Sequence, residues 1–132
     1  MIDATTFPDA EAEVISAIKA IKTSLFVSNA TPSPIPGEAV TVGFSGGGSR
    51  DWGEASTNLG INVFAPSDDE CAALVRELQD ILAATSNGMI QSVSVPAGGG
   101  TSIPSQSPPF QRYFAATVYL RGQSLIEVFD PS

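Results

Sequence analysis

The segment PSDDECAALVRELQDIL, residues 66–82, decides the fold because a helix start and an apolar stripe coincide in it. Ser67 can accept a hydrogen bond from the free amides of a first helical turn, and Glu70 stands three residues later, as a capping box requires. Asn87-Gly88 provides a stop. The apolar residues recur at helical spacing and predict one buried helix face: Cys71, Leu74, Val75, Leu78, Ile81 and Leu82.

A second helix is predicted upstream, from Asp9 to about Leu25. Its apolar residues also recur at helical spacing, with acidic residues in the first turns and lysines near the end, an order that suits the helix dipole. Residues 28–38, SNATPSPIPGE, contain three prolines and one glycine. They predict an irregular connector.

Two alternating stretches flank a glycine-rich turn and predict an antiparallel hairpin. The first covers residues 40–44, and the second runs from Glu54 to Ala65, with its apolar residues on one side and Ser56, Asn58 and Asn62 on the other. Ile90 to Val95 predicts a short strand and Arg112 to Arg121 a long one. Because both sides of this last strand are largely apolar, we expect both to be covered.

The order α-β-β-α-β-β predicts an α+β fold, a mostly antiparallel sheet of about four strands with two helices packed on one face. We expect one domain over residues 1–132, with flexible loops at 45–53 and 96–111 and a C-terminal tail at 123–132. Two helices cover only one face of such a sheet. A partner subunit is therefore expected to cover the other.

The composition argues against an enzyme. The chain has no histidine, which removes the usual general base at neutral pH and the usual nitrogen ligand of zinc. Fourteen acidic residues oppose six scattered Lys and Arg, so the net charge is −8 and nucleic-acid binding is disfavoured. No secretory signal and no membrane-spanning stretch is recognised, so synthesis in a cytoplasm is expected. We predict no catalytic residue, cofactor or metal.

Two motifs have a catalytic and a structural interpretation. Residues 43–47, GFSGG, match the G-x-S-x-G nucleophile elbow, but the elbow needs a helix after the serine and a histidine to take its proton, and the sequence offers neither. Cys71 is near a helix N-terminus, where a thiol pKa can fall, yet it lies on the apolar stripe. We favour a small buried side chain. Trp52, after the glycine turn, is either a contact anchor or part of the core.

The order of elements resembles the tail terminator proteins of long-tailed, siphovirus-type bacteriophages, particularly those of actinobacteria. The residues that carry the resemblance are the acidic first helix with its Pro-rich connector, Ile61-Asn62-Val63-Phe64-Ala65 before Ser67-Asp68-Asp69-Glu70, and a Gly/Pro-rich loop before Arg112 and Val118-Tyr119-Leu120-Arg121-Gly122. The similarity covers nearly the whole chain and rests on pattern and order.

The resemblance implies a structural virion protein that forms an oligomeric ring, usually a hexamer, on the head-proximal end of the tail tube. Such a ring stops tube polymerisation and docks the head-tail connector (stopper) protein, and DNA passes through its lumen without specific binding. It implies assembly in the host cytoplasm and no catalytic residues. The assembly-interface candidates are Gly46, Gly47, Gly48, Ser49, Arg50, Asp51, Trp52, Gly98, Gly99, Gly100, Pro108, Pro109, Phe110, Arg112, Tyr119 and Arg121.

Other functions remain open at this point. The nearest are another phage head-tail connector or head-completion protein and a tail tube subunit, which is usually richer in strand. A small ligand-binding domain or enzyme is a more distant alternative, because it would need a concave site with convergent polar groups.

Overall fold

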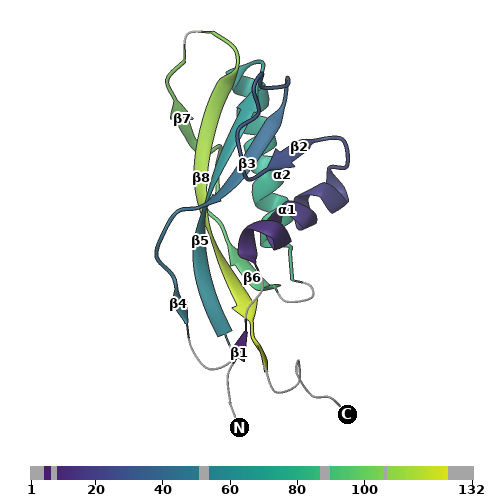
Figure 1. The fold of residues 1–132 in the computed structure, drawn as a ribbon. Coiled ribbons are helices and arrows are strands. Elements are labelled where there is room, and N and C mark those ends of the chain that lie inside the picture. The colour runs from purple at the N-terminus through teal and green to yellow at the C-terminus, as the bar shows by residue number, and fades with distance from the viewer. Residues whose placement is uncertain (1–4, 7–8, 51–53, 87–89, 106, 125–132) are drawn as a thin grey trace.

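The computed structural model describes residues 5–6, 9–50, 54–86, 90–105 and 107–124 and has an α+β fold (Figure 1). Its main sheet has seven strands, and the order along its path is β2-β3-β5-β8-β6, with β4 beside β5 and β7 beside β8. The bounds are β2 Phe26–Ser28, β3 Ala39–Phe44, β4 Ser49–Arg50, β5 Glu54–Ala65, β6 Ile90–Ser94, β7 Thr101–Ile103 and β8 Phe110–Arg121.

The long strands β5 and β8 form the centre of the molecule. They pair antiparallel along their whole length, from Glu54 opposite Arg121 to Ala65 opposite Phe110. On its other side β5 pairs antiparallel with β3, from Phe44 opposite Leu59 to Ala39 opposite Phe64. The predicted hairpin is therefore confirmed.

The N-terminal helix is shorter than predicted, and a strand follows it. The helix α1 (Ala10–Ile21) begins at its N-cap Asp9, whose side chain accepts from the Ala12 amide, and ends at Ile21 rather than near Leu25. Thr23 and Ser24 disfavour continuation because their hydroxyls compete for backbone hydrogen bonds. The strand β2 then pairs parallel with β3, so the sheet is mixed, although the other pairings of the main sheet are antiparallel as predicted. The sheet has seven strands rather than about four.

The second helix, α2 (Asp68–Ala83), begins as predicted. The Ser67 hydroxyl accepts from the Glu70 amide at 3.2 Å. The helix ends at Ala83, earlier than the predicted stop at Asn87-Gly88, which lies outside the described residues. Thr85 accounts for the early end, because its amide donates to the Leu82 carbonyl and its hydroxyl to the Ile81 carbonyl.

The two predicted loops contain strands, and their description as flexible loops is wrong for these parts. Residues 45–53 include β4, and residues 96–111 include β7, each paired antiparallel with a long strand. Gly46, Gly47 and Gly48 all have positive φ, and a Cβ on Gly48 would collide with the Ser56 carbonyl oxygen. These glycines let the chain step from β3 to β4 while both strands stay beside β5.

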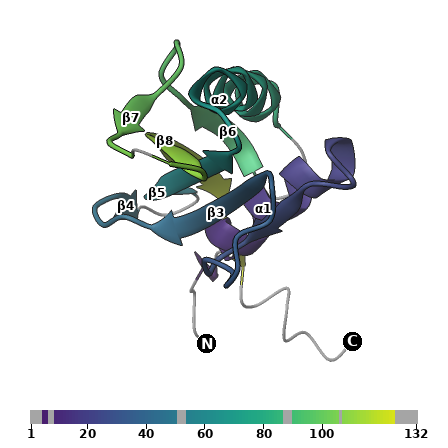
Figure 2. The ribbon, with the colours of Figure 1, turned by 90° about the horizontal axis from the view of Figure 1, so that it is seen from above.

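Both helices lie on the same side of the sheet, as Figure 2 shows from above. The core forms between the helices and the inner face of the sheet. It includes Val14 and Ile18 from α1, Leu78 and Leu82 from α2, and a strand set whose members are fully or nearly fully buried: Val40, Val42, Leu59, Ile61, Val63, Ile90, Val93, Phe114, Ala116, Val118 and Leu120.

The opposite side of the sheet, the outer face, is not covered by any described helix. Within the described chain the outer side of β8 is open, since Ala115 and Tyr119 are exposed, so its covering by a partner subunit stays a prediction. Beyond Arg121, the strand β9 (Gln123–Ser124) pairs with β1 (Thr5–Thr6), and the rest of the predicted tail, residues 125–132, lies outside the described residues.

Candidate functional site

Arg112 is a charged residue of β8 that connects three segments of the chain. Its Nε and Nη2 donate to the Asp68 carboxylate at 2.9 and 2.7 Å, and its Nη1 donates to the Gly99 carbonyl at 3.0 Å. These bonds hold the pKa of Asp68 below its usual range. Arg112 therefore ties β8 to the start of α2 and to the glycine-rich loop.

The glycine-rich loop, residues 98–100, lies close to β8 and to Arg112. Gly100 has a φ of +72°, and a Cβ there would lie 2.8 Å from the Tyr113 carbonyl oxygen. A Cβ on Gly99 would lie 3.1 Å from Nη1 of Arg112, so a side chain there would require the guanidinium to shift. The structure thus brings the predicted interface residues Gly99, Gly100 and Arg112 together, but their contacts are within the chain.

The other predicted interface residues lie elsewhere. Gly46 to Arg50 lie beside β5 on the β3 side, while β7 lies on the far side of β8, and Figure 2 shows β4 and β7 apart. Pro108 and Pro109 are exposed, and Phe110 is half-buried at the start of β8. Tyr119 is exposed on the outer face, Arg121 ends β8, and Asp51 and Trp52 lie outside the described residues. These positions do not form one site.

The two motifs have structural roles. Cys71 is fully buried, its thiol donates to the Val63 carbonyl at 3.1 Å, and burial raises its pKa. Ser45 is exposed, its amide donates to the Asn58 carbonyl, and β4 rather than a helix follows it. The interpretation of Cys71 as a small buried side chain is confirmed.

The outer face carries a patch that motif searching did not identify. Its exposed and half-buried residues are uncharged, and two of them are joined across the strands, where the Thr117 hydroxyl donates to the Asn58 carboxamide oxygen at 2.8 Å. The alternation of apolar and polar residues within Glu54–Ala65 predicts that Ser56 and Asn58 lie on the same side of the strand. We call this set the outer patch: Ser56, Asn58, Ser92, Ser94, Tyr113, Ala115, Thr117 and Tyr119.

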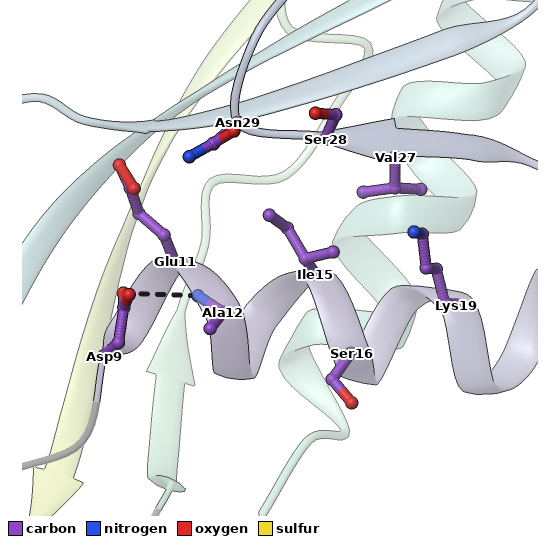
Figure 3. Close-up of a pocket in the computed structure, with 9 residues that line it drawn as sticks. All are labelled: Asp9, Glu11, Ala12, Ile15, Ser16, Lys19, Val27, Ser28 and Asn29. Carbon is purple, nitrogen blue, oxygen red and sulfur yellow. Dashed lines mark hydrogen bonds between the residues drawn. The ribbon is translucent and has the colours of Figure 1, made fainter.

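A groove between α1 and β2 has a volume of about 490 Å³ (Figure 3). Asp9 and Glu11 line one end and Lys19 the other. Both carboxylates serve the backbone, because Asp9 caps α1 and Glu11 accepts from the Phe44 amide at 2.9 Å. The two carboxylates that line the groove therefore have structural roles, and its lining residues do not converge as a reactive site.

The described residues contain no group of three His, Cys, Asp or Glu side chains placed to hold a metal ion. No helix among them is long and apolar enough to cross a bilayer. No protein-family model matches the chain, and comparison with curated proteins gives no match.

Proposed function

We propose that this chain is a structural virion protein of a siphovirus-type phage, a tail terminator that assembles as a ring, with six subunits expected, on the head-proximal end of the tail tube. The ring stops polymerisation of the tube protein and forms the surface to which the head-tail connector (stopper) protein docks. In this role the chain acts through contacts with copies of itself and with the tube, and DNA passes without specific binding.

The observation that carries the proposal is the outer patch. The chain has a net charge of −8, yet the patch has no charged side chain, and on the outer side of the described β5–β8 pair the charged residue types stand at its end, where Glu54 is opposite Arg121 in the strand register. The absence of charged residues and the presence of two tyrosines are features that the patch shares with protein interface cores. A neighbouring copy packed here would cover the face that the two helices leave open.

Electron microscopy of the purified protein, alone and with tail tube protein, tests the proposal. Closed rings, and tube lengths that stop growing when the chain is added, are the expected results. Tubes that lengthen without limit in its presence would contradict a terminating role.

A substitution on the outer patch tests the surface. Tyr119→Glu places a charge among uncharged side chains at a position 39% exposed, so it should leave the monomer folded and abolish ring formation. Ile21→Glu is the matched control, because Ile21 is 64% exposed at the end of α1, away from the patch. Equal ring formation by both variants would show that the outer patch is not the interface.

A tail tube subunit is the second candidate. The main sheet has seven strands, more than the four predicted, and richness in strand favours a tube protein. The same micrographs distinguish the two, since a tube subunit forms open tubes by itself, whereas a terminator forms closed rings.

A further inference from the structure

A pocket of about 300 Å³ is open on the outer face of the sheet, where β3, β5 and β8 lie side by side. Its floor consists of Gly43 of β3 and Gly60 of β5, which stand opposite each other in the strand register. Both alternate with core residues, Gly43 with Val42 and Gly60 with Ile61, so they belong to the outer side. A Cβ on Gly43 would meet no atom within 4 Å. The pocket is therefore deep enough to hold a ligand because two neighbouring strand positions lack side chains.

A row of three polar side chains borders this floor. Thr41 stands opposite Asn62, and Asn62 stands opposite Tyr113, so the row crosses three neighbouring strands. All three residues line the pocket. Tyr113 also leans over the floor, since a Cβ on Gly60 would lie 3.0 Å from its Cε2 and 3.2 Å from its hydroxyl oxygen.

Thr41 is the member of the row that points to a ligand. It is 7% exposed, and its hydroxyl has no hydrogen-bond partner among the described residues. The Nε2 of Gln79 in α2 is unpaired too, but that atom is closed to solvent, whereas Thr41 lines an open pocket. A hydroxyl that is so largely buried has lost most of its hydration, so a ligand group that bonds to it offsets this cost.

Asn62 is oriented before any ligand binds. Its Oδ1 accepts from Gln111 Nε2 at 2.8 Å, and this bond directs the carboxamide. Within the described chain the Nδ2 of Asn62 donates to no other group, and the Tyr113 hydroxyl also has no partner. The row thus presents one fixed N–H donor between two hydroxyls, each of which can donate and accept.

The pocket has no charged lining residue. A carboxylate or phosphate would find no cation there, and an ammonium group would find no carboxylate. An apolar ligand would leave Thr41 and Asn62 unpaired. Asn29 and Thr31, from the segment after β2, line the pocket as well and add a second carboxamide and a third hydroxyl. The matching ligand is uncharged and carries several hydroxyls, because each of its groups can then donate or accept as the lining requires.

We propose that this pocket binds an uncharged sugar ring. The ring hydroxyls bond to Thr41 Oγ1, Asn62 Nδ2 and the Tyr113 hydroxyl. The C–H groups of the ring lie over Gly43 and Gly60. The volume is at the lower end of the range for small-molecule pockets, which suits a single ring. This inference goes beyond the proposed function and does not depend on ring assembly.

Binding is tested by nuclear magnetic resonance of the full chain, titrated with glucose, galactose and N-acetylglucosamine, and with glucuronate as the charged comparison. At least one neutral sugar should give saturable shifts of the Asn62 carboxamide and of the Gly43 and Gly60 amides, and glucuronate should bind more weakly. Shifts that stay linear with concentration for all three neutral sugars would overturn the proposal, and so would tighter binding of glucuronate.

Gly43→Val tests the floor of the pocket. Its Cβ meets no atom within 4 Å and valine favours strands, so the variant should keep the thermal midpoint of the wild type and lose sugar binding. Ser94→Val is the matched control, because it places the same side chain at an exposed position of β6 outside the pocket. Equal affinity of the two variants for the sugar would contradict the assignment.

Thr41→Val tests the buried hydroxyl, since it keeps the shape of the side chain and removes the oxygen. The affinity for the sugar should fall about fivefold, the effect of one hydrogen bond. The thermal midpoint should not fall, because no bond within the described chain is lost. Thr101→Val, at an exposed position of β7, should bind like the wild type. An unchanged affinity of Thr41→Val would refute the site.

Tyr119→Glu separates this inference from the proposed function, because Tyr119 does not line the pocket. The variant should bind the sugar like the wild type while it forms no rings. If the wild type binds the sugar through Thr41 but forms no rings, the proposed function fails and the sugar site stands. If the wild type forms rings but binds none of the neutral sugars, the sugar site fails and the proposed function stands.

Discussion

The two faces of the β5–β8 ribbon differ in what completes them. On the inner face, Ile61 and Phe114 stand opposite each other and are buried by the chain's own helices. On the outer face, Asn58 and Thr117 stand opposite each other, bonded to one another and half-exposed. The inner face is complete within one chain, whereas the outer face around Asn58 and Thr117 has bonded polar groups and is not covered by a described helix. The proposed function would thus assign stability and assembly to opposite sides of the same two strands.

The largest expected effect belongs to the inner face. Ile61→Ala should lower the free energy of unfolding by about 3 kcal/mol, because it removes a fully buried side chain and leaves a cavity. Chemical denaturation followed by circular dichroism measures this. A loss below that of an outer-face substitution would break the comparison.

The glycine step between β3 and β4 comes next. Gly48→Ala should cost about 2 kcal/mol, because φ is +102° and the new Cβ meets the Ser56 carbonyl oxygen. Gly43→Ala is the control, since Gly43 has no atom within 4 Å of its Cβ position. Equal stability of the two variants, measured by denaturation, would mean that the step is not fixed by its glycines.

A smaller effect is expected on the outer face. Thr117→Ala should cost about 1 kcal/mol, the net contribution of one part-buried hydrogen bond. The double variant with Asn58→Ala should cost less than the sum of the two single variants, because the two side chains share that bond. Strict additivity in the denaturation data would show that the bond contributes nothing.

The smallest effect concerns pH and Arg112, a charged residue on the inner side of β8 that stands opposite Val63. The pKa of Asp68 is lowered in the folded protein by its hydrogen bonds to Arg112. The stability that the ionised carboxylate contributes is therefore fully present above the ordinary pKa of a free aspartate, about 3.9. It is lost as the pH falls through the lower folded pKa. Asp68→Asn should therefore flatten the acid limb of a stability–pH profile, and an unchanged limb would contradict the assignment.

Local patterns predicted much of this fold. The alternation in Glu54–Ala65 separated the inner residues from the outer ones, and Ser67 marked the start of α2. In contrast, β2, β4 and β7 are only two or three residues long. Each is a strand because a longer neighbour lies beside it, so Pro- and Gly-rich composition alone predicted loops.

The candidate sites were harder to predict, since they depend on contacts between distant segments. Arg112 and Asp68 are separated by 44 residues, and nothing in either segment marks their pairing. Gln79 reads in the sequence as one more polar residue of an amphipathic helix. The burial of its Nε2 without a hydrogen-bond partner depends on how the segment after β6 packs against α2, which the sequence pattern does not show.

The buried thiol of Cys71 has a practical consequence. It is the only cysteine in the chain, and its burial, raised pKa and bond to Val63 make it slow to react with alkylating reagents. A cysteine introduced at Ser92 or Ser94, both exposed, would therefore take a maleimide spin label alone. The native background is already suited to measuring label-to-label separations in any assembly that the chain forms.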